Sequence, residues 1–167
     1  MRRGAPQPGD LLLDPAVLLA LAVLVLNDHV LKGPGPAPLT GILSGMAGLI
    51  LMPSVLVAGT ELLAWLRGRW LAPSMRLMLA AGVAVGTAYA LVELLPAATQ
   101  LYGWTWGLLQ WPGATVLALL GGDPPPGIVP VRAVADPFDL LALPCLAIPV
   151  LLQARRLPAA SSTVSAA

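Results

Sequence analysis

Four long apolar stretches, separated by short segments rich in proline, glycine and charged residues, dominate this chain. The pattern predicts helices over about residues 14–32, 40–66, 73–95 and 137–154. At about 1.5 Å per residue, such helices reach or approach the roughly 30 Å thickness of a bilayer's hydrocarbon core. We therefore expect an all-α, polytopic membrane protein with four transmembrane helices. They form a single membrane domain, residues 1–156, followed by a disordered tail, residues 157–167.

The ends of these stretches carry helix-boundary signals. Asp14-Pro15 predicts a helix start, because Asp caps free backbone N–H groups and Pro fits the first helical position. Asp136-Pro137-Phe138-Asp139 repeats this pattern, with a second carboxylate at the third helical position. Gly33–Pro38 predicts a stiff turn, after which Thr40 is expected to cap the second helix. Pro53 predicts a kink within that helix.

The segment between the third and fourth helices, about residues 97–120, has a different pattern. Trp104, Trp106 and Trp111 lie close together, and this composition is typical of a membrane–water interface. Pro112-Gly113 is expected to interrupt the segment. The seven apolar residues of Ala114–Leu120 are too few to span, so they form either a re-entrant piece or part of a surface helix. We expect an interfacial amphipathic segment on the outer surface.

Composition agrees with membrane insertion. Apolar residues make up 57% of the chain and charged residues 10%, far fewer than in soluble domains. The net charge of +1 gives no reason to expect nucleic-acid binding. Arg2 and Arg3 precede the first apolar run, as in a signal peptide. Because no small-x-small cleavage site follows, we interpret the run as a retained helix.

The distribution of basic residues predicts the orientation. With four helices and the N-terminus inside, the cytoplasmic segments hold seven arginines and the outer segments only Lys32 and Arg132. This split satisfies the positive-inside rule and places both termini in the cytoplasm of a multi-pass cell (inner) membrane protein. The seven are Arg2, Arg3, Arg67, Arg69, Arg76, Arg155 and Arg156.

Counting along the helices brings six titratable residues to the outer face. They are Asp28, His29, Lys32, Glu93, Asp136 and Asp139. Ionisable groups at membrane depth suggest a functional site, but capping and bridging of helices explain them as well. Glu61, by contrast, is expected at the inner interface near Arg67. We assign no catalytic residue, metal site or cofactor.

The contacts within this outer polar cluster can be anticipated from spacing. Asp28 and Lys32 are four residues apart and share a helix face. We expect Lys32 to bridge Asp28 and Glu93, because an unpaired charge at that depth is costly. His29 lies about 100° around the helix from Asp28 and is expected to face the second helix at Thr40 or Ser44.

Three sequence blocks carry a resemblance. They are Asn27–Lys32, Leu39–Leu49 and Asp136–Pro144. Together they resemble a group of uncharacterised bacterial four-helix integral membrane proteins with Leu-Thr-Gly-Lys-Leu-Ser-Asp-like and Asp-Pro-Thr-Asp-Leu-like motifs. The resemblance implies the four-helix topology and no activity. Ile42 and Gly45 stand where the group has Lys and Asp, so two charges of the outer polar cluster are missing here.

Two functions remain open at this point. The first is a non-enzymatic accessory or partner-binding protein. It would contact lipid and either a membrane protein partner or a second copy through close-packing faces such as Gly41-x-x-x-Gly45, Ser44-x-x-x-Gly48 and Gly82-x-x-x-Gly86. The second is a small transporter or membrane enzyme that uses the outer polar cluster. The missing charges and the tryptophan-rich segment favour the first.

Overall fold

The computed structural model describes residues 6–31 and 37–157, and every element in these ranges is helical. Three helical stretches in the described ranges are long and apolar enough to cross a membrane, and Pro15–Leu31 is a shorter apolar helix. The three are Leu39–Leu66, Met75–Leu94 and Pro137–Arg156. The predicted all-α class is therefore confirmed. Lys32, the Gly33–Pro36 part of the predicted turn and residues 158–167 of the predicted tail lie outside the described residues.

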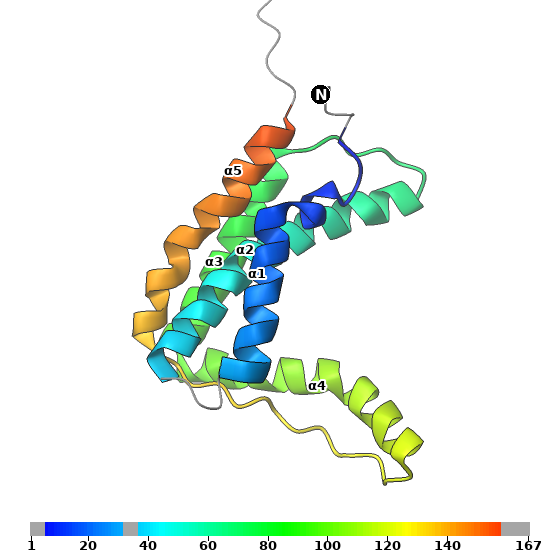
Figure 1. Ribbon diagram of the computed structural model, residues 1–167, viewed down its shortest axis with the longest axis vertical. Helices are drawn as coiled ribbons and strands as arrows, with labels where there is room; N and C mark the ends of the chain where they lie inside the picture. Colours follow the sequence, from blue (N-terminus) through cyan, green and yellow to red (C-terminus); the bar gives the residue numbers. More distant parts are fainter. Residues whose placement is uncertain (1–5, 32–36, 158–167) are drawn as a thin grey trace, which may run out of the picture. The chain divides into compact units, whose positions relative to one another are not determined.

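The elements follow the predicted order with some changes of boundary (Figure 1). Two single-turn or short irregular helices accompany the α-helices in the first half, and a longer 3₁₀-helix precedes the last one. In chain order they are η1 (Asp10–Leu13), α1 (Pro15–Leu26), the π-helical turn η2 (Asn27–Leu31), α2 (Ala37–Leu66), α3 (Met75–Leu94), α4 (Pro96–Gly121), the 3₁₀-helix η3 (Pro137–Leu146) and α5 (Ala147–Arg156).

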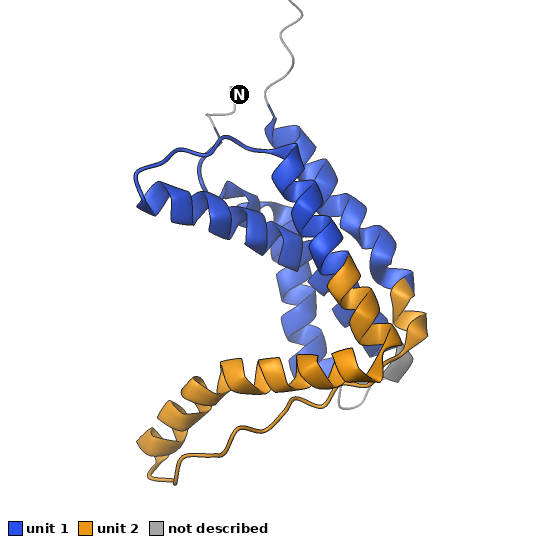
Figure 2. Ribbon diagram, turned by 180° about the vertical axis from the view of Figure 1, so that it is seen from behind, with its two compact units in different colours: residues 1–86, 141–167 blue, residues 87–140 orange. Residues whose placement is uncertain are grey.

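Figure 2 shows that the chain divides into two compact units. The first unit comprises residues 1–86 and 141–167, and the second comprises residues 87–140. The first unit therefore joins α1, α2, the first part of α3 and the end of the chain. The second contains the end of α3, all of α4 and the extended chain that follows it.

Helix starts were predicted with mixed success. The Asp14 side chain accepts a hydrogen bond from the Ala16 backbone N–H at 2.9 Å, which confirms it as the cap of α1. The prediction that Thr40 caps the second helix is wrong, because α2 already begins at Ala37. Pro38 is tolerated there, since the first turn of a helix has no use for its missing N–H group.

The third helix begins at Met75, two residues later than predicted from Pro73. Ser74 precedes it, and its Oγ accepts a hydrogen bond from the Leu77 N–H at 3.3 Å. A hydroxyl in this position satisfies a backbone N–H group that has no partner inside the helix. Ser74 therefore gives the better start signal of the two.

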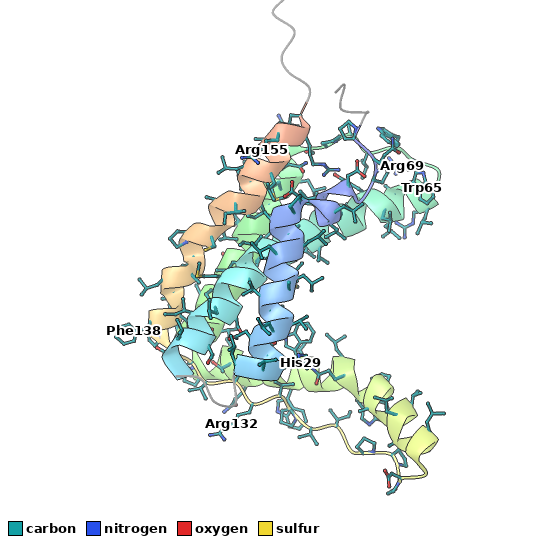
Figure 3. The ribbon with its side chains drawn as sticks, viewed as in Figure 1. His29, Trp65, Arg69, Arg132, Phe138 and Arg155 are labelled. Atoms are coloured by element: carbon teal, nitrogen blue, oxygen red, sulfur yellow. The ribbon has the colours of Figure 1, made fainter. Side chains whose placement is uncertain are left out.

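The second helix bends and then ends in a glycine cap. Pro53 lies inside α2, and Figure 1 shows the helix changing direction between its two halves, as the kink prediction requires. Gly68 has a φ of 71°, the left-handed conformation that terminates many helices. The Arg69 N–H then bonds to the Ala64 carbonyl at 2.9 Å. Trp65 and Arg69 lie together at this end of α2 (Figure 3).

The core of the first unit is small and apolar. It includes the N-terminal Leu11, which is 1% exposed, so residues 6–13 pack onto the unit. Burial of a leucine contributes about 1.5–3 kcal/mol, enough to hold a short segment in place. The buried core side chains are Leu11, Val17, Val57, Met78, Ala81 and Leu152.

The second unit is built on α4. The predicted interruption at Pro112-Gly113 is wrong: α4 runs unbroken through Pro112 and through Ala114–Leu120, and Figure 1 shows it bending. Proline removes one backbone hydrogen bond, which kinks a helix without necessarily ending it. Gly122, with a φ of 81°, ends α4 in the same left-handed manner as Gly68.

The fourth predicted helix has two parts. Residues Pro137–Leu146 form a 3₁₀-helix, and α5 follows over Ala147–Arg156. Pro144 lacks the N–H group that an uninterrupted α-helix would need there, and it lies inside the 3₁₀-helix. Pro149 is the third residue of α5, in a first turn whose N–H groups have no partner inside the helix. This stretch ends at Arg156, two residues beyond the predicted boundary.

Candidate functional site

The six residues of the predicted outer polar cluster fall into two groups. Asp28 and His29 belong to the first unit, whereas Glu93, Asp136 and Asp139 belong to the second. Lys32 lies outside the described residues. The expected bridge from Lys32 to Asp28 and Glu93 therefore stays a prediction.

Asn27 fastens the π-helical turn η2 to α2. Its side chain is fully buried and its Nδ2 donates to the Thr40 carbonyl at 2.8 Å and to Ser44 Oγ at 2.7 Å. Ser44 Oγ in turn donates to Asp28 Oδ1 at 3.1 Å. A π turn has more residues per turn than an α turn, which changes the angle between successive side chains. The side chains of Asn27 and Asp28 therefore both reach the start of α2. These contacts join two helices.

His29 does not take the expected partner. Its Nδ1 lies 3.0 Å from the Val25 carbonyl, one turn earlier in its own helix, and the residue is exposed. The contacts predicted for His29 at Thr40 and Ser44 are made by Asn27 and Asp28. The extra residue of the π turn rotates the side chains that follow it, which the 100° rule for α-helices does not anticipate.

The second group centres on the start of η3. Asp136 Oδ1 accepts from the Phe138 N–H at 2.9 Å, which confirms the predicted cap. Glu93 of α3, 9% exposed, accepts from the Asp136 N–H at 3.0 Å. In a capping box a carboxylate three residues into the helix makes this second bond, and here Glu93 supplies it in place of Asp139.

Asp139 is left with a different environment. Its backbone carbonyl accepts from the Tyr89 hydroxyl at 2.9 Å. Its Oδ1 is buried, and no described residue donates a hydrogen bond to it. Within residues 6–31 and 37–157, no three or more His, Cys, Asp and Glu side chains are arranged to hold a metal ion. The hydrogen bonds of Tyr89 to Asp139 and of Glu93 to Asp136 hold the end of α3 to the start of η3.

An ion pair between Glu61 and Arg156 was not anticipated from the sequence. Glu61 of α2 is 2% exposed, and its two carboxylate oxygens each lie 2.9 Å from a guanidinium nitrogen of Arg156 in α5. Such a two-pronged geometry is the strongest form of ion pair. Gln153, fully buried, bonds to Arg156 Nη1 at 3.0 Å and to the Ser74 carbonyl at 3.3 Å.

The N-terminal segment completes this arrangement. The Gly9 N–H donates to Glu61 Oε2 at 3.2 Å, and Arg156 Nη2 donates to the Gln7 carbonyl at 3.2 Å. The Glu61–Arg156 pair therefore connects three segments that are distant in sequence. The sequence does contain one signal for this pair. Glu61 lies in an apolar helix, where a charged group needs a partner, and Gln153 and Arg156 are three residues apart on one face of another helix.

The second unit holds a further feature that sequence reasoning missed. The return segment, residues 123–136, runs back along α4 in extended conformation. The Val131 N–H donates to the Gly103 carbonyl at 2.9 Å, and Trp111 Nε1 donates to the Pro126 carbonyl at 2.8 Å. Four of its residues are prolines, which have no backbone N–H group. The segment therefore has fewer backbone donors that would need a hydrogen-bond partner where water is absent.

Glycines on α4 make this close approach possible. A Cβ on Gly103 would lie 2.5 Å from the Val131 carbonyl oxygen, and one on Gly107 would overlap the Val129 carbonyl oxygen. Gly103 and Gly107 are buried, as is Thr99 one turn earlier. Gly103 and Gly107 have the small-x-x-x-small spacing of the faces predicted on α2 and α3. Here, however, an extended segment packs against the glycines, and not a second helix.

Comparison with known proteins adds no family. The sequence matches no protein-family model, no curated protein and no solved structure. The resemblance to bacterial four-helix membrane proteins stays a prediction.

Proposed function

We propose that this chain is a small multi-pass membrane protein that acts as a non-enzymatic accessory or partner-binding subunit. The observation that supports this most is the use of its polar side chains. Asn27 and Ser44 join two helices, Asp136 and Glu93 form a cap, and Glu61 is paired with Arg156. These groups are engaged in holding the helices together, which favours a structural over a chemical role.

The topology we propose has four spans. The three long apolar helices supply three of them, and Pro15–Leu31 supplies the fourth. Its length corresponds to about 25 Å, near the lower limit for crossing a bilayer. The positive-inside rule then places both termini in the cytoplasm of the cell (inner) membrane. The resemblance of the three sequence blocks supports the same number of helices.

We place α4 in the outer membrane–water interface. It contains no charged residue, and several of its large apolar side chains are exposed. An exposed apolar surface of this kind on a single helix requires lipid or protein cover. Its tryptophans and tyrosine favour the level of the lipid headgroups. The exposed residues include Leu101, Trp104, Leu108, Leu109, Leu117 and Leu120.

The partner-binding role rests on two glycines, the partly exposed Gly48 and the buried Gly82, at which an added methyl group would meet no other atom. A Cβ on Gly48 of α2 or Gly82 of α3 would meet no atom within 4 Å, whereas one on Gly86 would lie 2.7 Å from Leu146 Cδ1. Close-packing spacings in membrane helices serve to bring a second helix near. Gly86 has its neighbour within the chain, so Gly48 and Gly82 are the positions we assign to a partner.

Site-specific photo-crosslinking in cells tests this role. A photo-reactive amino acid at Gly48 or Gly82 is expected to give a covalent protein adduct, because a partner helix should lie against it. Val83, which is 69% exposed and lies about 100° further around the helix, is the matched control and should contact lipid only.

The size of the adduct identifies the partner. Twice the mass of the chain indicates a second copy, and any other mass indicates a different membrane protein. If neither glycine position gives a protein adduct, or if Val83 gives the same adducts, the partner-binding role is contradicted.

A further inference from the structure

A groove of about 530 Å³ lies between α4 and the return segment, entirely within the second unit. It lies beside Gly103, one of the two glycines at which the return segment approaches the helix closely. Its walls are mainly apolar, with Pro96 and Trp104 on one side and Pro130 and Val131 on the other. Gln100 and Arg132 are its long polar side chains.

Arg132 has no ionic partner in the part of the chain that the structure describes. Two of the carboxylates that flank α4 are engaged elsewhere: Glu93 accepts from the Asp136 N–H, and Asp136 accepts from the Phe138 N–H. Arg132 is exposed, and Figure 3 shows it projecting from the return segment. Its guanidinium is therefore available to a ligand.

The surroundings indicate what that ligand is. A guanidinium binds phosphate oxygens through paired hydrogen bonds, and a glutamine amide can donate another. The flanking helix exposes leucines and tryptophans, which suit acyl chains and the glycerol region of a lipid. A soluble phosphate compound would gain nothing from this apolar rim.

We propose that the groove between α4 and the return segment binds the headgroup of an anionic phospholipid, with Arg132 on its phosphate. The inference rests on the interfacial placement of α4 proposed above. The second unit has four acidic residues and Arg132 as its single basic residue. Without Arg132 this unit would repel an anionic lipid, so one substitution should remove the preference altogether.

The test uses the full chain in nanodiscs that contain equal amounts of phosphatidylglycerol and phosphatidylcholine. Native mass spectrometry then measures which lipid stays bound to the released protein. The wild type should retain phosphatidylglycerol about tenfold more than phosphatidylcholine, because both offer a phosphate but the cationic choline of phosphatidylcholine is repelled by Arg132 and leaves that headgroup neutral. Arg132→Gln should retain the two equally. Arg69→Gln, an exposed arginine of the first unit, is the matched control and should keep the preference.

Two results would overturn the proposal. One is an unchanged preference for phosphatidylglycerol in Arg132→Gln. The other is displacement of the bound lipid by millimolar glycerol phosphate, which would show that the site selects a free phosphate compound. Failure of the wild-type chain to enter nanodiscs at all would instead contradict the membrane assignment, so the two failures are distinguishable.

Discussion

Replacing Arg156 with methionine is expected to lower the free energy of unfolding by about 3–5 kcal/mol, because it leaves a buried carboxylate without its partner. Glu61 is 2% exposed, and both of its oxygens are bonded to Arg156. The same change removes the bond from Arg156 to the Gln7 carbonyl. We therefore also expect residues 6–13 to become sensitive to protease.

Denaturant titration in mixed micelles measures the first effect, and limited proteolysis measures the second. Arg155→Met is the matched control, since Arg155 is exposed and adjacent, and it should change stability by less than about 0.5 kcal/mol. Adding Glu61→Gln to Arg156→Met should recover much of the loss, because the buried group is then neutral. Equal stabilities of the Arg156→Met and Arg155→Met variants would show that the pair has no such role.

The second large effect is expected at Gly107. Replacing glycine with alanine inside a helix normally stabilises it by about 0.5–1 kcal/mol. Here the new methyl group would overlap the Val129 carbonyl oxygen and would lie 3.0 Å from the Pro130 Cα. Backbone atoms cannot rotate aside, so the return segment must shift, and such overpacking costs about 1–3 kcal/mol. Gly107→Ala should therefore destabilise the protein.

Gly113→Ala is the internal control for this prediction. Gly113 lies in the same helix, and a Cβ there would meet nothing within 4 Å. We expect this variant to be neutral or slightly stabilised, and Gly107→Ala to unfold at a lower denaturant concentration. If both variants gain stability alike, the return segment does not pack on α4 as described.

Helices and their order could be read from the sequence because they depend on local information. Asp14 caps α1 and Asp136 caps η3 as expected, since a carboxylate followed by proline acts within two residues. Thr40 and Pro112 were misread because the local signals compete. Pro38 is tolerated in the first turn of α2, and α4 bends at Pro112 without ending.

The contacts of the site could be predicted only in part, because they join segments that are distant in sequence. The Glu61–Arg156 pair spans most of the chain, and nothing near Glu61 in sequence indicates its partner. The π turn at Asn27 shifts the side chains after it, so the face assigned to His29 from α-helical geometry was wrong. The glycines of α4 were not recognised because the segment that covers them is extended and lacks a helical period.

Thiol labelling tests most directly whether the protein has the four spans proposed above, with α4 on the outer surface. Two variants are made in a Cys145→Ser background, each with one cysteine. One cysteine replaces Ala114, which is exposed in α4, and the other replaces Ala167 in the C-terminal segment. An impermeant maleimide is applied to intact and to permeabilised cells. We predict that Ala114→Cys reacts in intact cells and that Ala167→Cys reacts only after permeabilisation. Reaction of Ala114→Cys only after permeabilisation, or of Ala167→Cys in intact cells, would contradict the account.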